Sequence, residues 1–556
     1  MDRVEAICQS LLDWGASKPT RSVLLIGLIA LIVILPGLSA MPVTDRDEAR
    51  FAQASKQMLE TGDLIDIRFQ DQPRWKKPVG IYWLQAASAN FIGGGTQADI
   101  WAYRLPSALA AMLAVLLTIW AARPIVGARG AVLAGGILAT CLLLAGEANI
   151  AKTDAALMAS AVAVLGGMIR LLLGSGGVGA ALVFWLGISA AILLKGPIIP
   201  AIAILAFAWL WIMQRKRPAF ARFRPLPGLA LTVLLVAPWL VAIWQISDGA
   251  FFAEALGRDM GAKLTSGQEK HWGPPGLYSM LVWGTFWPWA AFLPIAAMAL
   301  WHRRKEPWLI LLTGWVLPFW IILEAVPTKL PHYVLPLYPA LAIALAAWLI
   351  SAPKEPPRWA KRLNAGLIAI PGGLLIGALL TLPFILEGTI VLPILPLLAI
   401  AAFALWIAAR SALNHRPMAQ IGASVLAVAM LYPSVLQFGL PSLTTAFASP
   451  KIAALTAQYR ACASGPLHSI GYREPSLVFL TETTTDLTGS ATAIPALTSD
   501  PGAMVLIESR GRDILGQKFP DGVVRGTVEY FNYNRGKFET ADLVTQDDSR
   551  WDACSG

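Results

Sequence analysis

The chain has 556 residues, of which 56% are hydrophobic and only 14% are charged, whereas a soluble globular domain has about 25% charged residues. Apolar runs of about 20 residues recur along most of the chain without strict alternation, which predicts a polytopic helical membrane protein and argues against an outer-membrane barrel. The net charge of +10 comes largely from basic loops between these runs, so it does not indicate a nucleic-acid-binding protein.

The first apolar run covers residues 23–41 and follows a polar leader that contains Arg3, Lys18 and Arg21. Leu38-Ser39-Ala40 resembles a signal-peptide cleavage site. The long leader and the length of the run favour an uncleaved anchor whose N-terminus is cytoplasmic, because basic residues stay on the inner side. Residues 44–100 then form an outer loop.

Twelve further apolar runs bring the prediction to about thirteen transmembrane helices. The loops predicted to lie inside are basic, except for the short Gly-rich loop 174–178, and this agreement supports the topology. An odd number of spans places the C-terminus outside. The further runs are 101–121, 131–149, 155–173, 179–195, 197–213, 227–246, 276–301, 307–325, 332–350, 363–386, 389–409 and 418–437.

The composition changes near residue 440. Residues 440–556 contain ten Lys and Arg against thirteen Asp and Glu, and their apolar runs are short. We therefore predict two parts: an all-α membrane domain over residues 1–439, with the outer loop 44–100, and a periplasmic α/β domain over residues 440–556. Segments 468–479 and 504–508 have the pattern of strands. Cys462 and Cys554 flank the second domain and either pair or remain two thiols.

Charged residues at the outer face are few, and five separate segments carry them near helix ends. Snorkelling and helix capping would explain any one of them, but together they favour a shared polar pocket. The first segment, 44–85, holds the densest set. The candidates are Asp47, Glu48, Arg50, Lys77 and Tyr82; Lys152 and Asp154; Lys195; Arg258 and His271; and Lys329, His332 and Tyr333.

Such a pocket suits the transfer of a sugar from a lipid phosphate. A carboxylate can take a proton from an acceptor, and clustered cations can stabilise a departing phosphate. At the outer face the expected donor is a sugar on a polyprenyl phosphate, and the chain has no P-loop or dinucleotide fingerprint. Asp45-Arg46-Asp47 resembles a metal-binding DxD, but the histidines lack zinc-ligand spacing. We predict no metal site and leave a divalent-cation requirement open.

Several motifs in chain order resemble the GT-C glycosyltransferases that use lipid-linked sugars, above all the ArnT-like group and the related protein O-mannosyltransferases. The resemblance covers the whole chain and implies the GT-C fold with a periplasmic C-terminal domain. The motifs are Asp47-Glu48-Ala49-Arg50-Phe51, Met58-Leu59-Glu60-Thr61-Gly62-Asp63, Trp75-Lys76-Lys77-Pro78 with Tyr82-Trp83, Lys152-Thr153-Asp154, Lys195-Gly196-Pro197, Lys329 to Pro336, and Gly471 to Ser476.

The resemblance implies that Asp47 is the catalytic carboxylate, that Asp154 is a second acid, and that Lys77 contacts the lipid phosphate. The remaining candidates would line the substrate site. Two positions depart from the family pattern: Lys76 replaces a Glu, and Lys152 replaces an Arg. Because the Glu-to-Lys change makes the pocket more basic, we expect a neutral or acidic sugar rather than a cationic amino sugar.

The predicted function is therefore an inverting glycosyltransferase of the bacterial inner membrane. It would move one sugar from a polyprenyl-phosphate donor to lipid A or a related glycolipid at the periplasmic face. Protein O-mannosyl transfer is the nearest alternative and differs in the acceptor. A lipid or sugar transporter is the alternative of another class, but transporters place polar residues near the bilayer midplane and often have two matching halves, which this sequence lacks.

Overall fold

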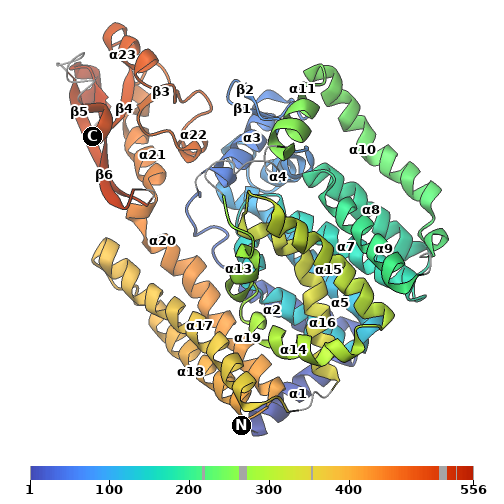
Figure 1. Cartoon of the computed structure of the whole chain (residues 1–556). Coiled ribbons are helices and arrows are strands. Elements are labelled where there is room, and N and C mark those ends of the chain that lie inside the picture. The colour runs from blue at the N-terminus through green and yellow to red at the C-terminus, as the bar shows by residue number, and fades with distance from the viewer. Residues whose placement is uncertain are drawn as a thin grey trace.

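The computed structural model describes residues 2–44, 46–215, 219–261, 272–351, 355–512, 522–533 and 535–554, except for the side chains of residues 256, 258–260 and 510 (Figure 1). The described chain is a large bundle of apolar helices with a small α/β domain at one end. The N-terminal helix α1 (Asp2–Ala16) lies at the opposite end of the bundle from this domain. The predicted fold class, helical membrane protein plus C-terminal α/β domain, is confirmed.

Among the described residues, nine helices are long and apolar enough to cross a membrane, or ten if one bent pair counts as a single span. The pair is α13 (Leu277–Thr285) and the segment Trp289–Arg303, which contains α14 (Leu293–Leu300). The other spans are α5 (Ile100–Ala139), α7 (Asp154–Leu172), α8 (Val178–Lys195), α10 (Pro225–Ser247), α15 (Pro307–Ala325), η7 (Pro331–Leu337) with α16 (Tyr338–Ile350), α17 (Arg358–Glu387), α18 (Ile394–Leu413) and α19 (Pro417–Pro433).

The predicted number of about thirteen spans stays a prediction. Two of the predicted spans are the shorter apolar helices α2 (Pro19–Ile34) and α9 (Ile198–Gln214). The predicted span 101–121 lies within the 40 residues of α5, and the predicted span 131–149 begins in α5 and continues beyond its end; α5 is broken at Gly127, where φ is 64° and ψ is −169°. A positive φ of this kind is readily adopted only by glycine, so Gly127 lets one continuous segment change direction.

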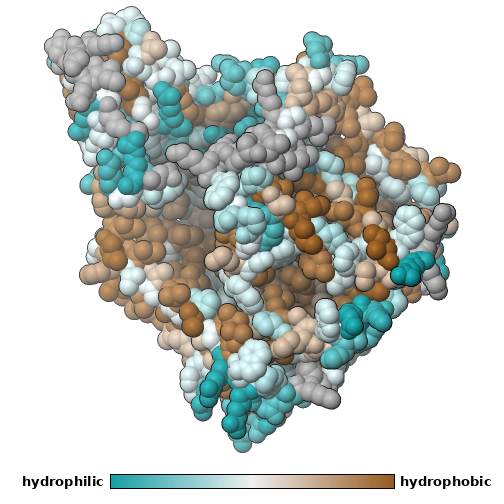
Figure 2. Space-filling view, in the orientation of Figure 1, coloured by the Kyte–Doolittle hydropathy of each residue, from teal (hydrophilic) through white to brown (hydrophobic). Residues whose placement is uncertain are grey.

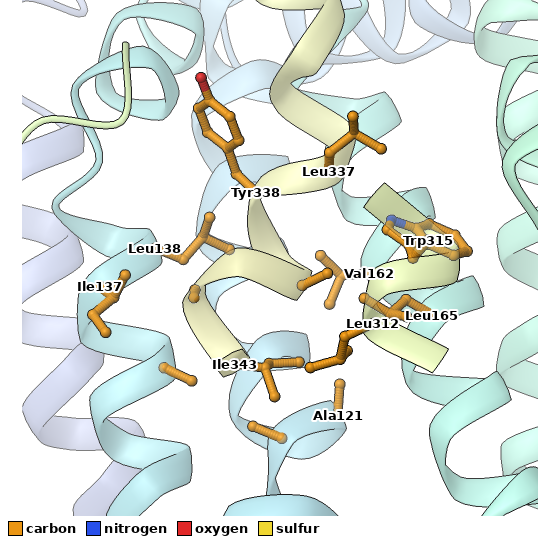
Figure 3. Packing of buried hydrophobic residues seen from close by; sticks show 14 of the residues in the cluster. Ala121, Ile137, Leu138, Val162, Leu165, Leu312, Trp315, Leu337, Tyr338 and Ile343 are labelled. Carbon is orange, nitrogen blue, oxygen red and sulfur yellow. The ribbon is translucent and has the colours of Figure 1, made fainter. Parts of the chain in front are cut away.

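Helix α7 is the centre of the bundle. All of its 19 residues are buried except Arg170 and Leu172. Val162 and Leu165 pack with residues of α5, α15 and α16 (Figure 3). In a membrane, close packing rather than the hydrophobic effect holds helices together, and small residues permit it. A Cβ on Gly166 would lie 2.5 Å from the Trp120 ring, so this glycine allows α5 and α7 to approach.

The outer flanks of the bundle are apolar, as the brown surface over the helices in Figure 2 shows. Hydrophilic residues gather at the two ends instead: on the C-terminal domain and near α1. This distribution is that of a protein whose helices are surrounded by lipid.

The first outer loop forms its own layer above the bundle. It contains α3 (Asp47–Thr61), the short strands β1 (Arg68–Phe69) and β2 (Gln72–Pro73), and α4 (Gly80–Phe91). Helix α3 follows α2 after the connecting residues 35–46, and Asp47 and Glu48 occupy its first turn, where acidic side chains stabilise the helix dipole. The short helices α6 (Leu142–Ala148) and α11 (Ala250–Phe252) complete this end of the bundle.

The C-terminal domain has a four-stranded sheet in the order β3-β4-β6-β5, in which β3 and β4 are parallel and the other pairs antiparallel. Its elements are α21 (Ala448–Tyr459), β3 (Leu467–Ile470), α22 (Pro475–Leu480), α23 (Ser490–Ser499), β4 (Met504–Glu508), β5 (Val523–Asn532) and β6 (Lys537–Thr545).

Two predictions for this domain can be compared with the structure. The predicted strand 504–508 is confirmed as β4, but the predicted strand 468–479 is wrong beyond Ile470. The chain turns at Gly471, where φ is +93°, and Pro475 begins α22, because proline is favoured in the first turn of a helix. The pairing of Cys462 with Cys554, which the sequence left open, is present as a disulfide.

The C-terminal domain packs on α3. Gln53 donates a hydrogen bond of 2.7 Å to the hydroxyl of Thr483, and the ring of Tyr103 meets that of Phe479 edge-on. The division at residue 440 stays a prediction, since a helical segment continues from α19 through η8 (Ser434–Gly439) into α20 (Leu440–Ser442).

Candidate active site

A cluster of five ionisable side chains lies where α6, α7, α8 and η7 meet. Glu147 is near the end of α6, Asp154 begins α7, and Lys195 ends α8. Lys152 precedes α7, and His332 lies on η7. We call these residues the charge cluster. Segments separated by up to 185 positions thus bring their charges together, as the sequence predicted for four of the five.

The distances within the charge cluster are those of ion pairs. The Lys195 Nζ lies 2.5 Å from Asp154 Oδ1, and the Lys152 Nζ lies 3.3 Å from Glu147 Oε2. His332 bridges the two acids, with Nδ1 3.6 Å from Glu147 Oε1 and Nε2 3.8 Å from Asp154 Oδ2. Every one of these side chains is about nine-tenths buried. Charges buried to this extent are costly unless they are paired, so their pairing holds the cluster together.

Helix ends explain why these residues occupy their positions. A carboxylate at the first residue of α7 and an ammonium at the last residue of α8 each complement the local helix dipole. Gly196 then ends α8 with a φ of +71°, and Pro197 precedes α9. The sharp break Lys195-Gly196-Pro197 therefore presents the ammonium group at the same end of the bundle as Asp154.

A cavity of about 240 Å³ opens beside the charge cluster. One side of it is polar and carries Lys77, Asp154, Lys195, His332 and Tyr333. Apolar side chains of α7, α9 and α15 form the rest: Leu157, Ile198, Ala201, Phe319, Ile322, Leu323 and Val326. A cavity lined by both basic and apolar side chains suits a molecule with an anionic head and a hydrocarbon tail.

The neighbouring acids favour the charged form of Lys152. Burial alone would lower the pKa of the Lys152 ammonium, but Glu147, Asp154 and Asp47 raise it above its ordinary value. The Lys195 Nζ lies 5.3 Å from the centre of the Tyr333 ring, within the range of a cation–π contact.

Asp47, the predicted catalytic carboxylate, lies on the exposed side of the charge cluster. It is exposed in the first turn of α3 and interacts electrostatically with Lys152. It does not line the cavity of Lys77 and Lys195. Its position suits a group that meets an acceptor arriving from the aqueous side. The role of Asp47 stays a prediction.

The Glu48 carboxylate accepts hydrogen bonds from groups within the fold. Arg104 of α5 donates two hydrogen bonds to it, of 2.7 and 2.8 Å, and the backbone amides of Thr44 and Ala151 donate two more. Glu48 and Arg104 are both fully buried. Burial alone would raise the pKa of Glu48, but these four donors lower it. These contacts give Glu48 a structural role in the fold. Its predicted contact with substrate stays a prediction.

Lys329 holds the end of α15 beside the cavity. Its ammonium donates to the backbone carbonyls of Leu323, Glu324 and Val326, at 3.0, 2.8 and 2.6 Å. Lysine near a helix C-terminus stabilises the last, otherwise unbonded, carbonyls. Because Leu323 and Val326 line the cavity, Lys329 positions its apolar wall. Its predicted contact with substrate stays a prediction.

The remaining candidates have mixed positions. Tyr82 is buried on α4 with its ring 5.2 Å from that of Phe51, and Arg50 is half-buried on α3. His271 lies outside the described residues, and so does the side chain of Arg258. The structure therefore brings Lys77, Lys152, Asp154, Lys195, His332 and Tyr333 together, and places Tyr82 and Lys329 in supporting positions.

Sequence reasoning missed two buried charges at this end of the bundle, Glu147 and Arg104. Both stand alone inside apolar helices, in LLLAGEA and IWAYRLP. An ionisable residue in a predicted span is rare and functional by default, so this rule would have identified both. Both lie within predicted spans, whereas the other candidates lie in loops or at helix ends.

Glu147, Asp154 and His332 also bring potential metal-ligand atoms within 4.8 Å of one another. Carboxylate and imidazole groups bind many divalent ions. However, the ammonium groups of Lys152 and Lys195 contact the same two carboxylates and already supply the positive charge that a metal ion would bring. The residues fit a cluster balanced by ammonium groups better than a metal centre.

The comparison with solved structures defines the class of fold. The crystal structure of ArnT from Cupriavidus metallidurans bound to undecaprenyl phosphate matches with a TM-score of 0.75, covering 96% of this chain and 99% of that chain at 19% identity. The oligosaccharyltransferase AglB from Archaeoglobus fulgidus, in complex with an inhibitory peptide and a dolichol-phosphate, matches at 0.51, with 12% identity over 95% and 75% of the two chains. The predicted GT-C fold is confirmed.

The comparison of sequences narrows the class to particular relatives. Residues 76–244 match the family described as dolichyl-phosphate-mannose-protein mannosyltransferase. Two proteins named undecaprenyl phosphate-alpha-4-amino-4-deoxy-L-arabinose arabinosyl transferase are each 30% identical. They are from Aeromonas salmonicida, over 62% of this chain and 63% of the relative, and from Aeromonas hydrophila, over 64% and 65%. The matches thus span just under two thirds of these relatives, and the predicted ArnT-like resemblance is confirmed.

Proposed function

We propose that the chain is an inverting glycosyltransferase that moves one sugar from a polyprenyl phosphate to lipid A or a related glycolipid at the periplasmic face of the inner membrane. The observation that carries this proposal is the cavity with a cationic side and an apolar side at one end of the bundle. The likeness to a fold that was solved with undecaprenyl phosphate bound supports it.

The cavity would hold the donor by its two chemically different parts. Lys77, Lys195 and His332 would bind the phosphate, and α9 and α15 would contact the first isoprene units. Charge-assisted hydrogen bonds to a phosphate strengthen as negative charge develops on the leaving oxygen. The same cations therefore both anchor the donor and favour the breaking of its sugar–phosphate bond.

The acceptor would approach from the aqueous side, past Asp47. In a single displacement, the acceptor oxygen bonds to the anomeric carbon while the bond to the phosphate breaks. Polyprenyl phosphate then leaves with the bonding electrons. Asp47 would orient the acceptor and, where the acceptor is a hydroxyl, take its proton. Asp154 would hold Lys195 in place through the 2.5 Å contact.

Two features support the proposed orientation in the membrane. The disulfide Cys462–Cys554 suits an oxidising compartment such as the periplasm, and the C-terminal domain that contains it packs on α3, beside the charge cluster. The basic loops lie at the other end of the spans.

For the sugar, the relatives point to aminoarabinose, against the neutral or acidic sugar expected from Lys76. Glu147 weakens that expectation, because it adds a buried carboxylate to a pocket that the sequence alone made look more basic. We infer that aminoarabinose is the donor sugar to test first. Protein O-mannosyl transfer remains the second candidate, since the matching family carries that description.

The test is donor discharge by the purified full-length protein in detergent, followed by mass spectrometry. We expect undecaprenyl phosphate-aminoarabinose to lose its sugar to lipid A with the wild-type protein. Asp47→Asn should abolish turnover without unfolding the protein, because Asp47 is exposed. Asp71→Asn, which changes another exposed acid of the same loop, should remain active.

Other results would redirect the proposal. Transfer to a peptide hydroxyl from a mannosyl donor would favour the second candidate. An unchanged donor with every acceptor, for a folded wild-type protein, would contradict glycosyl transfer and favour a transporter. Near wild-type turnover by Asp47→Asn would remove Asp47 from the mechanism.

A further inference from the structure

A second cavity, of about 190 Å³, lies at the other end of α7. It is formed by α1, α2, α5 and α7, and Arg123 and Arg170 are the charged residues that line it. Arg170 is sixteen residues beyond Asp154 on the same helix, so the two sites are roughly 24 Å apart at 1.5 Å per residue. The cavity is therefore separate from the candidate active site and opens at the opposite membrane surface.

Among the described residues, neither arginine forms an ion pair with an acid. The guanidinium of Arg170 lies 4.5 Å from the centre of the Trp120 ring, and one of its nitrogens donates to the Trp120 carbonyl at 2.7 Å. Its Nε is buried and has no hydrogen-bond partner in the described part of the chain. Arg123 has no ion pair there either, and its charge repels that of Arg170. Two like charges at one cavity, one of them with a buried donor that lacks a partner among the described residues, favour the binding of an anion there.

The rest of the cavity is apolar. Val23 of α2 and Leu116 and Ile119 of α5 line it beside the arginines. The break of α5 at Gly127 shapes this space, because residues from both sides of the break, Arg123 and Ala131, contribute to its wall. An anion-binding corner that continues into an apolar groove between helices fits a lipid: phosphate at the arginines, acyl chain along α2 and α5.

The positive-inside rule is an alternative explanation for arginines at this end of the bundle, because basic residues gather at the cytoplasmic membrane surface. That rule favours side chains that point to water, as Arg129 does: it is exposed and pairs with the exposed Asp13 at 2.9 Å. The Arg170 guanidinium instead packs against the Trp120 ring, and both residues line the cavity. The different treatment of two nearby arginines indicates that Arg170 is held for binding rather than for topology alone.

We propose that Arg123, Arg170 and Trp120 form a site for the phosphate of an anionic lipid headgroup. Basic pockets between transmembrane helices on the cytoplasmic side bind such headgroups in membrane proteins. The lipid would tie α2, α5 and α7 together at the end of the bundle opposite the candidate active site. The site does not depend on the proposed transfer reaction.

The test is native mass spectrometry of the purified full chain with added lipids. We expect the wild-type protein to retain phosphatidylglycerol about tenfold more strongly than phosphatidylcholine with the same acyl chains, because the choline cation neutralises the phosphate charge and is repelled by the two arginines. Arg123→Gln together with Arg170→Gln should remove this preference. The matched control Arg129→Gln changes an arginine at the same end outside the cavity and should keep it.

Two further experiments identify the source of the phosphate and control for misfolding of the double variant. Inorganic phosphate at the same concentration should not displace the lipid; displacement would assign the site to a free phosphate instead. Because Arg123 is exposed, Arg123→Gln alone should fold normally and weaken retention several-fold. Equal retention of both lipids by the wild-type protein, or an undiminished preference in the double variant, would overturn the proposal.

Discussion

Two groups of buried charge lie at the same end of the helix bundle and differ in their balance. Glu48 and Arg104 form one pair, in which Arg104, Thr44 and Ala151 donate to the carboxylate and backbone carbonyls accept from the rest of the guanidinium. The charge cluster instead sets three basic side chains against two acids beside an open cavity. A pair whose hydrogen bonds all stay within the fold holds the fold together, whereas basic groups that line a cavity are available to a ligand.

The largest expected effect is the loss of the Glu48–Arg104 pair. Glu48→Gln leaves Arg104 charged and buried, and breaking a buried pair costs about 3–5 kcal/mol of folding free energy. We expect a large fall in the melting temperature of the purified protein, measured by intrinsic fluorescence in detergent. Glu355→Gln is the control, because its partner Lys361 forms an exposed pair that contributes about 1 kcal/mol or less. A melting temperature like that of the wild type would refute the structural role of Glu48.

The charge cluster should show the reverse pattern. Lys195→Met removes one ammonium from the cavity, but Lys152 and His332 still face Asp154, so we expect the fold to remain. Turnover should fall about a hundredfold, as for the loss of one preorganised donor to a developing charge. Donor discharge and melting temperature, measured on the same preparation, check both parts. Lys361→Met is the control and should keep normal turnover. Normal turnover by Lys195→Met as well would mean that Lys195 serves only to neutralise Asp154.

Lys77 should have a smaller effect. It lies on the polar side of the cavity, so Lys77→Ala is expected to raise the KM for the lipid-linked donor about tenfold, the loss of one charge-assisted contact. Lys76→Ala removes an equal charge from the neighbouring residue, which does not line the cavity, and should change KM less. Equal effects of the two substitutions would indicate a general surface potential rather than a specific phosphate contact.

The smallest effect concerns pH. The folded pKa of Glu48 is lowered, so its ion pair stabilises the protein fully above the unfolded value of about 4.3. This contribution is lost as the pH falls through the lower folded pKa. The wild-type melting temperature should therefore decline on acidification over this range more than that of Glu48→Gln. Parallel curves for the two proteins would contradict the assignment.

Sequence patterns predicted the helical bundle well because each apolar run reports directly on a span. They also placed Lys77, Lys152, Asp154, Lys195 and His332 in one pocket, since charges at helix ends on one membrane face have few other places to go. Sequence patterns could not show that, of the adjacent residues Asp47 and Glu48, Glu48 is the buried acid and Asp47 the exposed one. The direction of each side chain from the first turn of α3 decides that distinction, and only Arg104, far along the chain, reveals it.

The remaining differences have local causes. Glu147 and Arg104 lie within apolar helices, where hydropathy alone hides a single charge. The strand predicted over residues 468–479 ended early because a glycine with positive φ and a helix-starting proline interrupt an otherwise apolar segment. Gly-x-x-x-Pro punctuation of this kind predicts a turn followed by a new element.

The central claim is that this protein unloads a sugar from a polyprenyl phosphate. The most direct measurement is mass spectrometry of total lipids and lipid A from matched cells with and without the gene. We predict that cells without it accumulate a sugar-loaded polyprenyl phosphate and lack a substituent of the size of aminoarabinose on lipid A. Identical polyprenyl-phosphate and lipid A profiles in the two strains would contradict the account.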